Sequence, residues 1–112
     1  MPEITDDFMR EMLGRTAEFT AVILRDGPNA SAANRDELVW EHGRRNFELR
    51  ADGTLAIVCP VMDDTDVCGI GIFTTTPDET RKVMDADPGV QAGLFVYEVH
   101  PVRSFPGDAL PA

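Results

Sequence analysis

The segment from Asn34 to Pro60, NRDELVWEHGRRNFELRADGTLAIVCP, predicts a helix, a tight turn and a strand in succession. Asn34 is a favoured N-cap residue, and Glu37 stands three positions later, as a capping box requires. Gly53 ends the helix, because glycine readily adopts the left-handed conformation that follows a helical C-terminus. Residues 55–59, LAIVC, then form a nearly continuous apolar run, which predicts a central strand.

The predicted helix carries apolar residues on two sides. We expect one side, at a helical repeat of about 100° per residue, to pack on a sheet. Its members are Trp40, Gly43, Phe47 and Ala51. His42 lies on a neighbouring stripe with Val39, Asn46 and Leu49. Imidazole can accept or release a proton near neutral pH, so His42 is the first candidate for acid–base chemistry.

The remaining elements follow from the same kind of local signal. A helix capped by Thr5 runs to Leu13, and a second helix begins at the sequence Thr76-Pro77-Asp78-Glu79, which combines a cap, an early proline and a capping-box glutamate. Branched and aromatic runs predict three further strands, at residues 18–25, 67–75 and 94–100. The order is a helix followed by βαββαβ, which predicts an α+β, ferredoxin-like fold.

We expect residues 1–112 to form a single domain with a core at about residues 18–102 and a proline-rich tail at 103–112. Alternation along the third strand places Gly69, Gly71 and Phe73 on one face and Cys68, Ile70 and Ile72 on the other. Two glycines on one face leave a hollow. Because both helices would lie on one side of the sheet, we expect this glycine face to be uncovered and to join a second copy in a homodimer.

Composition excludes several classes of function. The net charge of −10 argues against a nucleic-acid partner and against an anionic membrane surface. The chain contains no run of about 18 apolar residues that could span a membrane. Its acidic start is unlike a signal peptide, so the cytoplasm is the expected location. Nothing in the sequence indicates a cofactor.

The two cysteines, Cys59 and Cys68, are expected to be reduced, as is usual for cytoplasmic proteins. In a hairpin centred on Asp63 and Asp64 they would stand opposite one another, which makes a disulfide conceivable but not expected. Together with the two histidines, His42 and His100, they lack metal-ligand spacing, so no metal site is predicted.

A set of motifs in this chain resembles those of the YCII-related (YciI-like) family. The resemblance covers about residues 19–102. The matching positions are His42, Leu49, Gly53, Leu55, Cys59-Pro60, Asp63 and Asp64, Asp87-Pro88-Gly89-Val90 and Ala92-Gly93-Leu94. The resemblance implies a dimeric α/β-barrel arrangement and an acid–base site centred on a histidine and an aspartate. Relatives include dehydrochlorinase-like and muconolactone-isomerase-like proteins. The chain departs from the family in Cys59, which replaces a usual glycine, in its extra N-terminal helix and in its longer tail.

The resulting hypothesis is that His42 acts as a general acid or base and that Asp87 orients it. In a βαββαβ sheet the two helices are neighbours, so these two side chains are expected to come within hydrogen-bond reach. Isomerisation or elimination on a small molecule, which can be anionic, would use such a pair. The candidate substrate-binding residues are Arg45, Asn46, Gly69, Gly71 and Phe73. Non-catalytic binding of a small molecule in the same hollow remains the alternative, and a purely structural oligomerisation unit would have no cavity.

Overall fold

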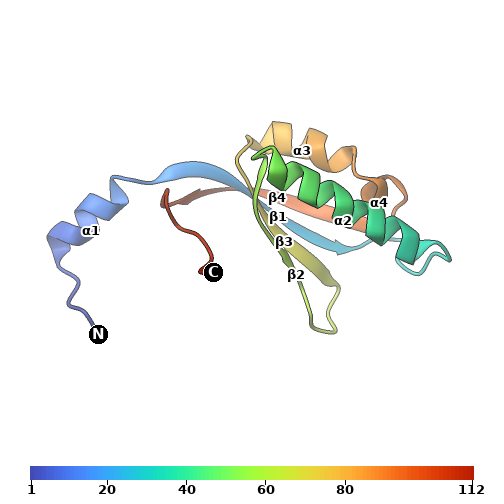
Figure 1. The fold of residues 1–112 in the computed structure, drawn as a ribbon, viewed down its shortest axis with the longest axis horizontal. Coiled ribbons are helices and arrows are strands. Elements are labelled where there is room, and N and C mark those ends of the chain that lie inside the picture. Colours follow the sequence, from blue (N-terminus) through green and yellow to red (C-terminus); the bar gives the residue numbers. More distant parts are fainter.

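The computed structural model describes all 112 residues. Its elements are α1 (Asp6–Leu13), β1 (Ala17–Asp26), α2 (Arg35–Ala51), β2 (Leu55–Pro60), β3 (Val67–Phe73), α3 (Pro77–Asp85), α4 (Pro88–Gln91) and β4 (Phe95–Ser104). The strands form one antiparallel sheet in the order β2-β3-β1-β4. Helices α2 and α3 lie on the same side of this sheet (Figure 1). The α+β, ferredoxin-like prediction is therefore confirmed. None of the helices is both long and apolar enough to cross a lipid bilayer.

A two-stranded ribbon extends the sheet at one end and carries α1 away from the body (Figure 1). β4 pairs with β1 as far as Ala17↔Ser104, whereas β3 pairs with β1 only from Thr20 onwards. The predicted tail at 103–112 is thus wrong at its start, because the strand continues to Ser104. Pro101 does not interrupt β4, because β4 is an edge strand and a proline there need not donate a hydrogen bond to a neighbouring strand. Thr5 caps α1 as predicted, accepting a hydrogen bond from the Phe8 N–H at 3.1 Å.

The core lies between the sheet and the helices that cover it. Its buried hydrophobic residues are Val22, Leu24, Leu55, Phe73, Met84, Leu94 and Phe95. α3 is fixed to this face by the stripe that includes Thr80 and Met84, both buried, and by the Tyr97 hydroxyl, which donates to Asp85 at 2.6 Å. The capping box at Thr76 and Glu79 is present as predicted.

The prediction for the packing face of α2 is wrong. Trp40 is 70% exposed and Phe47 is 64% exposed, so their side of the helix faces solvent. Leu38 and Leu49 pack against the core instead, on the side of the helix that carries His42. The helix is apolar on both sides, but only the side that carries His42 offers a hydrogen-bond partner to the buried carboxylate of Asp87. Without such a partner, burial of the carboxylate would be costly.

The predicted capping box at the start of α2 is also absent. Asn34 has φ −96° and ψ 19°, and its side chain makes no capping hydrogen bond. An N-cap side chain reaches the helix from an extended backbone, as Thr76 does with φ −65° and ψ 162°. The Arg35 N–H donates to the Ala32 carbonyl at 3.0 Å, so Asn34 belongs to a turn and does not have the extended backbone of an N-cap.

The assignment of the sheet faces is reversed from the prediction. Gly71 pairs with Val22 and Gly69 with Leu24, so the glycine face is the one that carries the core and lies under the helices. The face without helices instead carries apolar residues at the alternate positions: Ala21, Ile23, Ile57, Ile70, Ile72 and Val96. The 55–59 segment is not a central strand either, because β2 forms an edge of the sheet. The apolar residues of β2 are divided between the two faces of the sheet: some pack on the core, and the others lie on the open face.

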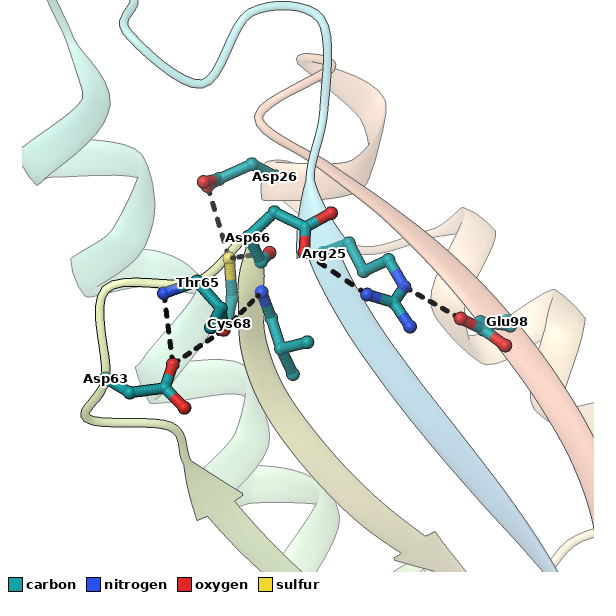
Figure 2. Close-up of polar contacts among 8 residues, drawn as sticks. Arg25, Asp26, Asp63, Thr65, Asp66, Cys68 and Glu98 are labelled. Atoms are coloured by element: carbon teal, nitrogen blue, oxygen red, sulfur yellow. Dashed lines mark hydrogen bonds and ion pairs between the residues drawn. The ribbon is translucent and has the colours of Figure 1, made fainter.

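A β-bulge where β1 and β3 meet changes the position of Cys68. The register shifts between Leu24 and Arg25, and Cys68 turns onto the helix side, where its thiol lies 3.2 Å from Asp26 Oδ1 (Figure 2). Cys59 pairs with Ile70, two positions from the register expected for a cysteine pair, and both thiols are free. Near this bulge Arg25 forms ion pairs with Asp66 at 3.2 Å and with Glu98 at 2.7 Å (Figure 2).

A glycine substitution tests the junction between β1 and β4. A Cβ at Gly27 would lie 2.5 Å from the Gly93 carbonyl oxygen and 3.0 Å from the backbone of Phe95. Because backbone atoms cannot move aside cheaply, we expect Gly27→Ala to lower the free energy of unfolding by about 1–3 kcal/mol. Urea denaturation measures this change.

Gly43→Ala is the matched control, because a Cβ at Gly43 meets nothing within 4 Å. Alanine is a better helix former, so we expect a gain of about 0.5–1 kcal/mol in this variant. Equal stability of the two variants would contradict the close backbone approach at Gly27.

Candidate functional site

The site is built around Asp87, which lies between α3 and α4. Pro88 follows it, so the backbone at Asp87 is extended, with φ −70° and ψ 133°, and the chain begins a new short helix. One carboxylate oxygen, Oδ2, accepts hydrogen bonds from the N–H groups of Gly89 at 3.0 Å and Val90 at 3.2 Å. Asp87 therefore caps α4, an element that the sequence analysis did not predict, and it is only 1% exposed.

The structure brings His42 and Asp87 together. His42 Nδ1 lies 2.8 Å from Asp87 Oδ1. An ionised carboxylate can only accept, so Nδ1 carries a proton and donates it to Oδ1. In the neutral imidazole Nε2 is then the acceptor, and Asn46, one turn further along α2, donates its amide N–H to Nε2 at 3.3 Å. This arrangement leaves Nε2 as the basic atom of the ring.

Two opposing effects act on the carboxyl of Asp87. Burial raises its pKa, while the hydrogen bond and positive charge of His42, the Val90 N–H and the Arg45 guanidinium lower it. The lowering effects dominate, so the pKa of Asp87 lies below its ordinary value. Asp87 is consequently a carboxylate at neutral pH, which is the form that can orient an imidazole and stabilise an imidazolium.

A cavity of about 270 Å³ opens beside His42 and Asn46. Its walls are mainly apolar, and Gly69, Gly71 and Phe73 of β3 contribute to them. A Cβ at Gly71 would lie 3.1 Å from Phe73 Cε2 and 3.3 Å from Leu55 Cδ1, so glycine keeps this wall open. The ring of Phe95 lies 4.9 Å from the imidazole of His42, at an interplanar angle of 51°, and holds it against the core.

The arginine at the cavity is Arg35 and not the predicted Arg45. Arg45 does not line the cavity; its Nη1 lies 3.6 Å from Asp87 Oδ1, where it helps to compensate the buried carboxylate. Arg35 does line the cavity, and it is the one permanently charged side chain that does so. The sequence analysis missed it, although Arg35 stands seven positions before His42 and so shares its side of a helix.

Arg35 is held in place at the mouth of the cavity. Its Nη1 donates to the Ala30 carbonyl at 2.8 Å, and its guanidinium lies over the Phe95 ring at 5.9 Å. Nη2 is 3.9 Å from Asp26 Oδ1. The guanidinium retains further N–H groups beyond the one bound to Ala30, and these can bind an oxygen atom of a ligand.

The other polar side chains near the site have structural roles. Burial, followed by the hydrogen bond to Asp26, raises the pKa of the Cys68 thiol to about 11. Cys68 is therefore protonated at neutral pH and is no nucleophile. His100 lies on the open face of the sheet, where Nε2 is 2.9 Å from Glu98 Oε2. No group of three or more His, Cys, Asp or Glu side chains is placed to hold a metal ion.

The lowered pKa of Asp87 gives a prediction for stability against pH. A carboxyl with a lowered folded-state pKa stabilises the fold above its unfolded pKa, about 3.9, and loses that contribution as the pH falls through the folded value. We expect Asp87→Asn to cost about 1.5–3 kcal/mol at pH 7, because charge-assisted hydrogen bonds are lost, and to cost less below pH ~4. Urea denaturation at several pH values measures the difference.

Asp78→Asn is the control, because the Asp78 side chain is 91% exposed and forms only a surface pair with Arg81. This variant should change stability by less than about 1 kcal/mol at any pH. A cost of Asp87→Asn that stays constant down to pH ~2 would show that the charge of Asp87 is not what stabilises the fold.

Comparisons with known proteins establish the fold but no family. No family model matches the chain, and no curated protein matches it. Among solved structures, the chain is similar to 5-chloro-2-hydroxyhydroquinone dehydrochlorinase (TftG) from Burkholderia phenoliruptrix AC1100, in complex with 2,5-dihydroxybenzoquinone. The TM-score is 0.55 at 23% sequence identity, and the match covers 73% of this chain and 90% of that chain. The two proteins share their fold.

Proposed function

We propose that this protein catalyses proton transfer on a small molecule, with His42 as the general acid and base. The observation that carries the proposal is the His42–Asp87 contact, 2.8 Å between Nδ1 and Oδ1, beside an apolar cavity. A buried carboxylate that fixes the tautomer of an imidazole supports general acid–base catalysis, because it orients the ring and stabilises the imidazolium.

The proposed step begins at Nε2. This atom exchanges its 3.3 Å contact with Asn46 for a substrate and takes a proton from a carbon next to a carbonyl group. The electron pair of the broken C–H bond moves toward the carbonyl oxygen, and Asp87 stabilises the imidazolium. In an isomerisation Nε2 returns the proton to a different carbon. In an elimination the electron pair instead expels a leaving group as an anion, and the proton is released later to water.

Arg35 supports a substrate that carries a carbonyl or an anionic oxygen. The negative charge that develops in the step falls on oxygen, and a guanidinium at the cavity mouth stabilises it. The similar dehydrochlorinase was solved with 2,5-dihydroxybenzoquinone, a small ring with oxygen substituents. We therefore take a planar, oxygen-substituted molecule of that size as the substrate class. Arg45, which is paired with Asp87, has no part in binding it.

The family and the assembly belong to the same proposal. The fold and the His42–Asp87 pair support membership of the YCII-related family. The sheet face without helices supports a homodimer, because Ile70 is 44% exposed and Val96 is 47% exposed on it. A second copy that covers this face would lie on the side of the sheet opposite the cavity, so each copy keeps a complete site.

Loss of proton transfer in a His42 variant tests the function. Wild-type protein in D₂O should accelerate exchange of the ring hydrogens of 2,5-dihydroxybenzoquinone, or of hydrogens next to the carbonyl in a panel of small hydroxyquinones and keto acids. We expect His42→Ala to reduce the rate by about 100-fold or more, because the base is removed. Nuclear magnetic resonance follows the loss of each proton signal.

His100→Ala is the matched control, since that histidine lies outside the site, and it should exchange at the wild-type rate. Gly69→Leu fills the cavity from a position where a Cβ meets only the Cys59 carbonyl oxygen, at 3.5 Å, so it should abolish binding without unfolding the chain. Probes that bind wild-type protein but are never exchanged would leave the alternative function, binding without turnover.

A further inference from the structure

Two side chains that follow His42 on α2 contact the two ends of its acid–base pair. Arg45 and Asn46 stand three and four positions after His42, so one turn of helix places all three on the same side. Asn46 Nδ2 lies 3.3 Å from His42 Nε2. Arg45 Nη1 lies 3.6 Å from Asp87 Oδ1. The two contacts therefore act on opposite ends of the His42–Asp87 pair.

The contact made by Asn46 favours the neutral form of the imidazole. Nδ1 of His42 holds its proton against Asp87, so the neutral ring offers a lone pair at Nε2 to the amide N–H of Asn46. A protonated ring has no such lone pair, and two N–H groups would face one another. A hydrogen bond that only the neutral form can accept disfavours the charged form.

Arg45 weakens the attraction between Asp87 and a protonated ring. Asp87 Oδ1 is the oxygen that accepts from His42 Nδ1, and the same oxygen faces the Arg45 guanidinium. The carboxylate is buried and the Arg45 side chain is only 23% exposed, so salt and water screen the interaction little. The negative charge that would stabilise an imidazolium is thus already partly balanced, and a second positive charge there is repelled.

The other titratable groups around the cavity do not reverse this balance. Arg35, at the mouth, adds a further positive charge. β2 and β3 contribute the thiols of Cys59 and Cys68, and Asp26 of β1 accepts from the Cys68 thiol and lies near Arg35. No carboxylate lines the cavity, although the chain carries 20 acidic residues. The buried carboxylate between α3 and α4 is thus the one negative charge in contact with the imidazole.

We propose that Arg45 and Asn46 are positioning residues that keep His42 neutral in the free protein, so that its first step is to take a proton. This role rests on the proposed function and narrows it. A reaction that began by protonating the substrate would need an imidazolium at rest. A neutral imidazole near the cation of Arg35 instead suits a substrate that brings a proton to lose and an oxygen to bear the resulting charge.

Substrate binding releases part of this control. A substrate that takes the place of Asn46 at Nε2 removes a hydrogen bond that only the neutral ring can accept. The ring then binds a proton more tightly than it does in the free protein. His42 is therefore a stronger base when a substrate is present, while Arg45 remains beside Asp87 and keeps that carboxylate ionised.

The protonation of His42 can be followed directly, because the chain contains only two histidines. In a nuclear magnetic resonance titration of the full chain, the ring signal that remains in His100→Ala belongs to His42. The measured quantity is the pH at which His42 is half protonated. We expect Arg45→Gln and Asn46→Ala each to raise this midpoint by about 0.5–1 pH unit, or about three- to tenfold in the protonation constant, because each removes a group that favours the neutral ring.

Arg44→Gln is the matched control. Arg44 is the neighbouring arginine on α2, and it pairs at the surface with Glu41 at 3.2 Å and not with Asp87. Its loss should leave the midpoint of His42 unchanged. Arg45→Lys keeps the positive charge and should also keep the wild-type midpoint, whereas a role in packing alone would make the midpoint insensitive to that charge.

An unchanged midpoint in Arg45→Gln overturns the inference. So does an unchanged or lowered midpoint in Asn46→Ala, because the amide would then be turning to accept a proton from the charged ring. If Arg45→Gln does not fold, Asn46→Ala decides alone.

The titration uses no substrate, so its result is separate from that of the exchange experiment. Raised midpoints without exchange of any probe would contradict the proposed function and leave the neutral resting state of His42 standing. Where exchange occurs, the pH profile of its rate should move to higher pH in Arg45→Gln and Asn46→Ala, in parallel with the titration.

Discussion

The carboxylate of Asp87 is almost completely buried, and the four groups that compensate it come from two helices, α2 and α4. It ends the α3 region, caps α4 through Gly89 and Val90, and binds His42 and Arg45 of α2. A buried charge without partners would destabilise the fold by several kcal/mol, roughly the cost of leaving such a group unpaired. The rotation of α2 about its axis follows from this requirement. His42 and Arg45 must face inward, so Trp40 and Phe47 must face outward.

The same constraint shapes the cavity. With His42 held at the helix–sheet boundary, the space beneath it is kept open by Gly69 and Gly71, which stand in β3 opposite Leu24 and Val22. Larger residues at these positions would fill the volume that the core does not use. The imidazole thus lies between a buried anion on one side and an apolar space on the other. Arg35 lines the same cavity and lies, like His42, beside the Phe95 ring, so a ligand would meet a base and a cation in one apolar space.

Three apolar surfaces remain outside the core: the side of α1 that carries Phe8, Met9 and Leu13, the side of α2 that carries Trp40 and Phe47, and the open sheet face. Each has a separate position on the molecule, so a single contact between two copies need not cover all three. The open face is the broad one and suits a sheet-to-sheet contact.

The sequence by itself determined the elements other than α4, and their order, because caps, turns and apolar periodicity are local properties. Thr5, Gly53 and the Thr76–Glu79 capping box all mark boundaries that the structure contains. The approach of His42 to Asp87 also followed from element order, since neighbouring helices on one sheet face bring their flanking stripes together.

What only the tertiary structure decided is the facing of each element. A helix that is apolar on two sides carries no local signal for which side packs, and the choice came from Asp87, 45 positions away from His42. The glycine face of β3 and the edge position of β2 were set in the same way, by strand pairing between distant segments. Arg35 reached the cavity for the same reason, because its role depends on where Phe95 and Asp26 lie in space.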